Sequence, residues 1–399
     1  MLSDQTIAFG ESFTTALLGL DALYATEQRK PESSTQSDIE RLVVLNMSTT
    51  HQPDPFANYD EAIIRFQEMA EVSANLPEAD RRVYYRQASE SAIAFAEWRA
   101  NGLPFADQIS RFLHVPAAPA QEAELDNLRH EMRSLLTELG YSGDLAAQCS
   151  SWESRHRVPP DEVIATLESL LNEAWDLTAE LIEIPAEKSD YMRVSAVTGV
   201  PFNAQCDFTG RTIRLNIDPI LTVPSLRHLA VHEGCPGHYL QFKRREASYL
   251  AGNSPADGLL SVVNTASSSP FEGIADHGLS VIGWDRDLDG KLASILARYR
   301  SGIGTRAAWR MHAEDWDRSR VREELFRDAL VGGEGWVENR LRFISRADRS
   351  ALIWSYWQGE PNVATPWNAA VNSGADWADW TSFVYDRMHS INSIAMFGR

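Results

Sequence analysis

The stretch His232-Glu233-Gly-Cys-Pro236-Gly237-His238 places two imidazoles and a carboxylate close together inside an apolar, helical pattern. Neutral imidazoles bind divalent metal ions, and a nearby carboxylate can take a proton from a water molecule that the ion polarises. The stretch could also be a buried helix that carries two histidines and ends at a Pro-Gly turn, because short motifs match by chance. We interpret it as part of a metal site.

The spacing of the two histidines predicts an interruption of this helix. Residues at i and i+6 lie about 120° apart around an ideal helix, too far to share one ion. Pro236 has no amide hydrogen, and its ring clashes with the carbonyl of residue i−4, which is His232. Gly237 tolerates the backbone geometry that results. We therefore expect a bulge or a break that turns His238 back toward His232.

The sequence allows more than one role for His228 and for Cys235. His228 and His232 stand at i and i+4 and need no distortion, so His228 could be a ligand, a partner that orients a ligand, or a plain helix residue. Only the pairing of His232 with His238 explains the Pro-Gly insertion, so we favour the latter two roles. The thiolate of Cys235 could touch a metal, but we expect a small buried thiol that packs the bulge.

A third ligand is expected from a later helix. Ser269, Pro270 and Glu272 form a pattern typical of a helix start, with the serine as cap and the glutamate in the first turn. A tetrahedral site with one open position needs three protein ligands, and Glu272 could be the third. Glu272 could equally serve only to complement the helix dipole.

These residues resemble the domain-of-unknown-function 885 family, whose members are mostly helical, zincin-like proteins regarded as metallohydrolases or metallopeptidases. The resemblance implies that His232, His238 and Glu272 bind zinc. It also implies that Glu233 is the general base and that Tyr356 stabilises an oxyanion or contacts the substrate. It covers the second half of the chain and rests on His232-Glu233-x-x-Pro236-Gly237-His238-x-x-Gln241, then Glu272-Gly273, then Tyr356-x-x-Gly359.

The chain departs from the family pattern after Glu272-Gly273. The family usually continues Trp-Ala-x-Tyr-x-Glu, whereas this chain continues Ile-Ala-Asp276-His277, without the second glutamate. A family Asp-x-Gly-x-His element is not evident near Ser301-Gly-Ile-Gly-Thr305. These differences argue against ordinary peptidase activity and favour a specialised small substrate. Asp276 and His277 could orient a metal ligand instead, or could lie on the helix surface.

Composition excludes some classes of partner. The 399 residues include 37 basic and 56 acidic side chains, a net charge of −19 that argues against binding to nucleic acid or to an anionic membrane surface. The 44% hydrophobic content supports a substantial core. We expect a small-molecule or peptide substrate, and the sequence does not predict an oligomeric state.

The expected compartment is the cytoplasm. The start Met1-Leu-Ser-Asp-Gln lacks the basic and apolar regions of an export signal, and no apolar run is long enough for a membrane span. Many relatives of the family carry lipoprotein-type leaders, and none is evident here. Cys149, Cys206 and Cys235 are too few and too far apart for a disulfide framework.

The patterning predicts a mainly α-helical protein with a small β-sheet next to the metal helix. We expect an N-terminal helical lobe, 1–190, and a zincin-like catalytic lobe, 191–399, although the two could form one integrated domain. The catalytic lobe would hold a short β region, 192–217, then metal helices within 224–285, then C-terminal helices. Apolar residues recur at helical spacing in 5–28, 58–75, 78–101, 120–140 and 160–184.

Three short strands are predicted within the β region. They are Arg193–Val197, Phe202–Phe208 and Thr212–Ile217, with a turn at Asp207–Gly210 in which Gly210 would allow a positive φ. An edge of this sheet could pair with an extended substrate, or the sheet could be a passive support.

The C-terminal part offers side chains for a substrate pocket. Its many tryptophans usually indicate packing between helices, although some could line an aromatic pocket. Arg298, Arg300 and Arg306 lie on one helical segment, and one of them could bind a substrate carboxylate through its planar fork. Surface salt bridges are the expected role of at least two. The tryptophans are Trp309, Trp316, Trp336, Trp354, Trp357, Trp367, Trp377 and Trp380.

We therefore predict a zinc-dependent hydrolase that cleaves an amide or peptide-like bond through a metal-activated water. Two alternatives remain. The same ligands suit Fe(II), so the protein could be a lyase or an iron-dependent oxygenase. The departures after Glu272 would also suit a catalytically inactive metal-binding scaffold.

Overall fold

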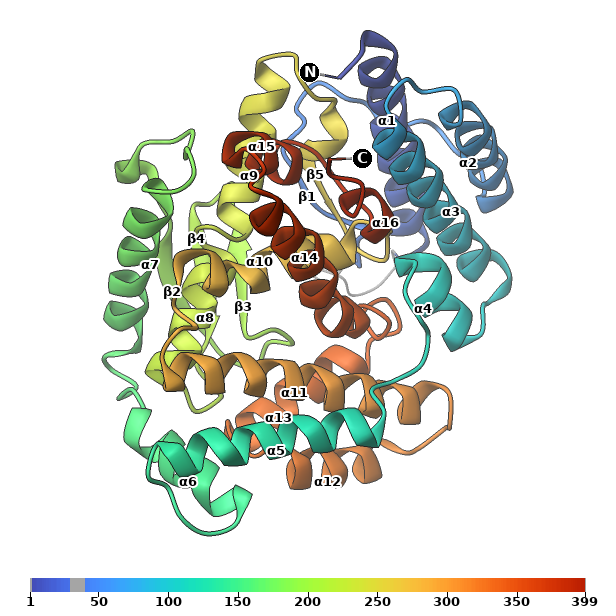
Figure 1. The fold of residues 1–399 in the computed structure, drawn as a ribbon. Helices are drawn as coiled ribbons and strands as arrows, with labels where there is room; N and C mark the ends of the chain where they lie inside the picture. The colour runs from blue at the N-terminus through green and yellow to red at the C-terminus, as the bar shows by residue number, and fades with distance from the viewer. Residues whose placement is uncertain (1, 29–39, 399) are drawn as a thin grey trace. The chain divides into compact units, whose positions relative to one another are not determined.

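The computed structural model describes residues 2–28 and 40–398, and it is mainly α-helical with small β-sheets (Figure 1). This confirms the predicted fold class. The chain forms two compact units, one of residues 1–117, 242–271 and 361–399, the other of residues 118–241 and 272–360. The division differs from the lobes expected from the sequence, because residues 118–190 belong with the second unit and residues 242–271 and 361–399 belong with the first.

The first unit is built on three long helices whose apolar faces meet in an aromatic core. Phe13 lies edge-on to both Phe66 and Tyr85, with ring centroids 5.9 and 5.5 Å away. An antiparallel pair of short strands completes this unit. Its elements are α1 (Asp4–Gln28), β1 (Val43–Asn46), α2 (Tyr59–Ser73), α3 (Ala79–Asn101), α4 (Phe105–Leu113), η3 (Ala256–Leu259), β5 (Leu260–Val262), α15 (Trp377–Tyr385) and α16 (Ile391–Ile394).

The second unit holds most of the motif residues. Its helix α5 runs alongside α11, while α7 packs against both α8 and β2 (Figure 1). These contacts explain why residues 118–190 do not form part of a separate N-terminal lobe. Its elements are α5 (Glu122–Glu138), α6 (Leu145–His156), α7 (Val163–Ala179), η2 (Lys188–Asp190), β2 (Arg193–Val197), β3 (Ala204–Asp207), β4 (Thr212–Asn216), α8 (Val223–Glu233), α11 (Leu288–His312), α12 (Arg318–Asp328) and α13 (Gly333–Ile344).

Three further helices begin in one unit and end in the other. They are α9 (His238–Leu250), α10 (Ser268–Ile282) and α14 (Ile353–Ser373). The start of α10 lies two residues before the expected Pro270, since Ser268 already belongs to the helix. The backbone N–H of Thr265 donates to the Ser268 hydroxyl, so Ser269 is not the cap that the sequence suggested.

The predicted strands form one sheet in the order β2-β4-β3, with β2 parallel and β3 antiparallel to β4. The turn between β3 and β4 differs from expectation, because Arg211 rather than Gly210 has the positive φ, of 49°. Gly210 instead lies close to the side chain of Asp207. Its N–H donates to the Asp207 carboxylate, and a Cβ there would lie 2.5 Å from that side chain.

Candidate functional site

The helix that carries the histidine motif is interrupted, as predicted. Helix α8 ends at Glu233 and α9 begins at His238, with a cis peptide bond before Pro236. A Cβ on Gly237 would lie 2.1 Å from the carbonyl oxygen of His232, so only glycine fits there. The interruption brings the rings of His232 and His238 together, with centroids 4.6 Å apart.

Three potential ligand atoms converge beside this break. The Nε2 atoms of His232 and His238 lie 3.3 and 3.5 Å from Oε2 of Glu272, which belongs to the next helix, α10. All three side chains are buried, with 7%, 7% and 9% of their residue surface exposed. Although both nitrogens are near, Glu272 Oε2 has no hydrogen-bond partner of acceptable geometry. The carboxylate oxygen is therefore buried and unsatisfied.

The spacing of these atoms fits a bound metal ion. A tetrahedral zinc ion with bonds of 2.0–2.1 Å separates its ligand atoms by about 3.3–3.4 Å. Burial alone would raise the pKa of Glu272, but the two imidazoles outweigh burial and lower its pKa to about 2. The glutamate is therefore a carboxylate at neutral pH. His232, His238 and Glu272 thus provide the donor set that a zinc or Fe(II) ion uses.

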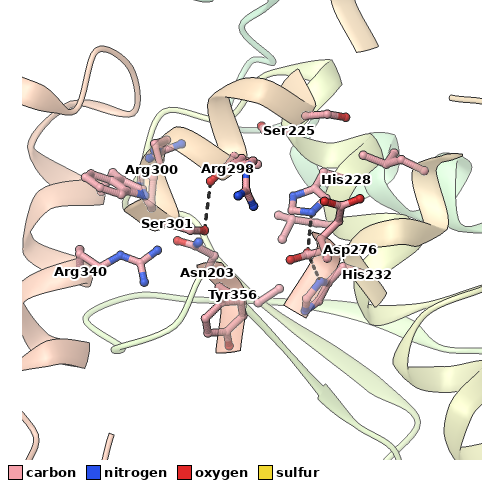
Figure 2. A pocket seen from close by; sticks show the side chains of 18 of the residues that line it. Asn203, Ser225, His228, His232, Asp276, Arg298, Arg300, Ser301, Arg340 and Tyr356 are labelled. Atoms are coloured by element: carbon pink, nitrogen blue, oxygen red, sulfur yellow. Dashed lines mark hydrogen bonds and ion pairs between the residues drawn. The ribbon is translucent and has the colours of Figure 1, made fainter. Parts of the chain in front are cut away.

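Asp276 orients one of these ligands. Its Oδ1 accepts hydrogen bonds from Nδ1 of His232 at 2.8 Å and from Nε2 of His228 at 2.9 Å (Figure 2). A hydrogen on Nδ1 leaves the lone pair on Nε2 of His232, the atom that faces Glu272. Burial would raise the pKa of Asp276, yet the neighbouring His232 and His228 lower that pKa well below its usual range.

His228, His232 and Asp276 also form a group that could hold an ion. Their separations of 2.8 and 2.9 Å are ordinary hydrogen-bond lengths, shorter than the edges of a zinc tetrahedron. We therefore assign the metal to the group of His232, His238 and Glu272, and a hydrogen-bonding role to His228.

The alternative that Asp276 and His277 lie on the helix surface is wrong. Helix α10 turns both side chains inward, and Nδ1 of His277 lies 3.3 Å from Glu360 Oε1.

Glu233 and Tyr356 lie beside the same cavity as His232. Glu233 is the last residue of α8 and is buried, and Tyr356 belongs to α14. The tyrosine ring stacks at 24° to the His232 ring, with centroids 6.4 Å apart. The motif residues thus meet at one place, although they come from three separate stretches of chain.

The cavity has a volume of about 520 Å³ and is lined only by residues of the second unit. Arg298 and Arg300 of α11 line it, whereas Arg306 does not. The expectation that at least two of the three form surface salt bridges is wrong, because two face the cavity and Arg306 is buried. Arg306 pairs instead with the carboxylates of Glu122, Glu324 and Asp328. Its role is therefore to hold α11 against α5 and α12.

One charged lining residue, Arg340, was missed in the sequence. Arg340 of α13 lies in the cavity wall together with Trp336, one helical turn before it. Their i, i+4 spacing was the available signal. Trp336 is one of the predicted tryptophans, and it both packs in the core and faces the cavity.

Cys235 is completely buried between the two helices, and its N–H donates to the Tyr191 hydroxyl at 3.0 Å. Burial raises the pKa of its thiol well above the usual range. Within the described part of the chain, no potential metal-binding group includes a cysteine. Cys235 therefore has the packing role that was expected.

Comparison with known proteins shows the fold alone. No family model matches the chain. No curated protein matches it either. Among solved structures, it is similar to a putative lipoprotein from Colwellia psychrerythraea, with a TM-score of 0.56 and 13% identity over 84% of this chain and 65% of that one. A putative lipoprotein of unknown function from Shewanella oneidensis has a TM-score of 0.53 and 12% identity over 84% and 72%.

The chain thus spans about two thirds of the length of these structural neighbours. A search of the helices in residues 2–28 and 40–398 found none that combines the length and the apolar character needed to cross a bilayer.

Proposed function

We propose that this protein is a metal-dependent hydrolase, with zinc as its ion, that cleaves an amide or peptide-like bond in a small substrate. The observation that carries the proposal is the convergence of His232, His238 and Glu272, with Nε2–Oε2 separations of 3.3 and 3.5 Å around an otherwise unsatisfied carboxylate oxygen. The resemblance of the motif to the domain-of-unknown-function 885 family supports the same proposal.

Each side chain then has a defined task. When bound, the ion would lower the pKa of a water molecule and polarise the substrate carbonyl. Glu233 accepts the proton of the attacking water and delivers it to the leaving nitrogen. Tyr356 donates a hydrogen bond to the oxygen on which negative charge develops. Asp276 keeps His232 in the tautomer whose Nε2 is available for binding.

A second candidate follows from the same donor set. Two imidazoles and one carboxylate also suit Fe(II), so the chain could support oxygenase or lyase chemistry. Elemental analysis of protein purified without chelator separates the candidates, because zinc favours hydrolysis and iron favours oxidation. A stoichiometric metal without any turnover by the wild-type protein would instead leave the inactive metal-binding scaffold.

Glu233→Gln tests the hydrolytic mechanism. We expect it to bind one metal per chain but to lose about 10²–10⁴-fold in turnover of an N-acyl amino acid or dipeptide library read by mass spectrometry. His238→Ala, the matched variant, should lose the metal as well. Wild-type turnover by Glu233→Gln would remove Glu233 from the mechanism.

We also propose the cytoplasm as the compartment, because all three cysteines are free thiols. The structural neighbours described as lipoproteins favour the cell envelope instead. Fractionation of the source cells, with detection by an antibody, would distinguish the two compartments.

A further inference from the structure

Two arginines in the cavity wall form no ion pair, although the charge of Glu153 acts on Arg300 from a longer distance. Nε and Nη2 of Arg300 and Nε of Arg340 are buried without any hydrogen-bond acceptor. Among the residues that the structure describes, no carboxylate forms an ion pair with either guanidinium. Burying a cation without a partner is costly, so the arrangement calls for an explanation.

Arg306 shows how a structural arginine of this protein is accommodated. It lies on the same helix as Arg300 but is surrounded by Glu122, Glu324 and Asp328. Arg300 and Arg340 instead lie against one tryptophan. Their Cζ atoms are 4.1 and 5.4 Å from the centroid of Trp336. An aromatic face attracts a cation but accepts none of its in-plane N–H groups.

The two charges also act on each other. Burial, and then the positive charge of Arg340, lower the pKa of Arg300 to about 9 against the opposing charge of Glu153. Burial likewise lowers the pKa of Arg340 to about 10. Both side chains would therefore be stabilised by an anion that enters the cavity.

The arginines lie across the cavity from His232, which is one of the three candidate metal ligands and lines the cavity wall. In Figure 2, Arg300 and Arg340 lie on one side, His232 and Asp276 lie on the opposite side, and Tyr356 is between them. The rings of Trp336 and Phe343 lie beside the arginines in the cavity wall, which also includes the apolar side chain of Ile220.

We propose that Arg300 and Arg340 form a carboxylate-binding subsite for the substrate. A carboxylate fits because its two oxygens can accept paired hydrogen bonds from a planar guanidinium. The substrate class is then a small amide with a free carboxylate and an apolar or aromatic group, such as an N-acylated amino acid. The position of the amide at the metal centre rests on the proposed function, whereas carboxylate binding by the arginines does not.

Titration calorimetry on the full-length, chelator-treated protein tests the subsite without the metal. The probes are benzoate and hippurate, each compared with its neutral amide, benzamide or hippuramide. We expect benzoate or hippurate to bind with a stoichiometry of one molecule per chain. The matching neutral amide should bind about tenfold more weakly, or worse. Equal binding of acid and amide, or no binding of either acid, would overturn the proposal. Inorganic phosphate that binds as tightly as the acid would overturn the assignment to a carboxylate.

Variants assign the binding to the two arginines. Arg300→Met and Arg340→Met should each weaken carboxylate binding at least about tenfold, and Arg340→Lys should weaken it less, because it keeps the charge. Arg342→Met is the matched control on the same helix, since Arg342 lies outside the cavity and faces Asp218 at 3.7 Å. Unchanged carboxylate binding by both methionine variants would show that the arginines only pack against Trp336.

The thermal midpoint separates these roles even if one variant folds poorly. A packing role predicts that methionine lowers the midpoint of the free protein. The proposal predicts an equal or higher midpoint, because a buried, unpaired charge is removed. A metal-loaded, active enzyme without carboxylate preference would leave the proposed function intact and refute only the subsite.

Discussion

Asp276 Oδ1 lies 2.8 Å from Nδ1 of His232, on the side of the ring opposite the candidate metal position. Asp276 comes one helical turn after Glu272 on α10. One face of a single helix thus supplies a carboxylate for the candidate ion and another for the histidine that would bind the same ion. This arrangement makes Asp276 a positioning residue for His232.

Asp276→Asn should weaken metal binding about 10–100-fold, because the neutral amide keeps an acceptor but loses the charge that favours the Nδ1–H tautomer. Competition with a chromophoric chelator would measure the affinity. His228→Phe is the control, since it removes only the second hydrogen bond to Asp276 and should change the affinity less. Wild-type affinity in Asp276→Asn would refute the positioning role.

Tyr356→Phe should lower kcat about 10²–10³-fold and leave the metal content unchanged, because it removes only a hydroxyl that would stabilise the oxyanion. Steady-state kinetics on any substrate from the acyl amino acid library would measure the effect. A change confined to KM would instead indicate that Tyr356 contacts the substrate away from the reacting carbonyl.

Local signals in the sequence predicted much of the fold. Apolar spacing located α1, α2, α3, α5 and α7 to within a few residues, and the short strands β2, β3 and β4 were found in order. The start of α10 was missed because the hydrogen bond from Thr265 to Ser268 extends the helix beyond the Ser-Pro signal. The two units could not be predicted, since they depend on contacts between distant segments.

The candidate site also has parts that local sequence predicts and parts that depend on contacts between distant segments. The break between His232 and His238 was predictable because Pro236 acts on its own helix. The role of Asp276 remained open, although its position four residues after Glu272 was visible. The pairing of Arg300 with Arg340 depends on how α11 and α13 pack around Trp336, which no local pattern encodes.

Gly273→Ala should destabilise the protein by about 1–3 kcal/mol, because a Cβ there would lie 2.3 Å from the carbonyl carbon and oxygen of Gly359. The two backbones touch beside Glu272 and near Tyr356, so the variant should also bind metal more weakly. Urea unfolding and chelator competition would measure the two effects. Gly258→Ala is the control, since its Cβ would meet only ordinary contacts at 3.4 Å.

Asp257 predicts a pH dependence of stability in the first unit. Burial raises its pKa to about 6, against an ordinary value of 3.8, despite the nearby charges of Arg81 and Arg245. Its Oδ2 atom is buried without a hydrogen-bond partner. The folded state thus holds the carboxyl proton of Asp257 more tightly than the unfolded state does. Protonated Asp257 therefore contributes to stability below pH 3.8, and this contribution is lost as the pH rises to 6.

Asp257→Asn should therefore raise the free energy of unfolding at pH 7.5, by up to about 3 kcal/mol, and change it much less at pH 4.5. Urea unfolding of both proteins at the two pH values gives the difference, in which titrations shared by the two proteins cancel. Asp161→Asn, at an exposed position, is the control and should have little effect at either pH. A variant that is destabilised at pH 7.5 would show that the ionised Asp257 is held favourably by Arg81 and Arg245, contrary to the raised pKa.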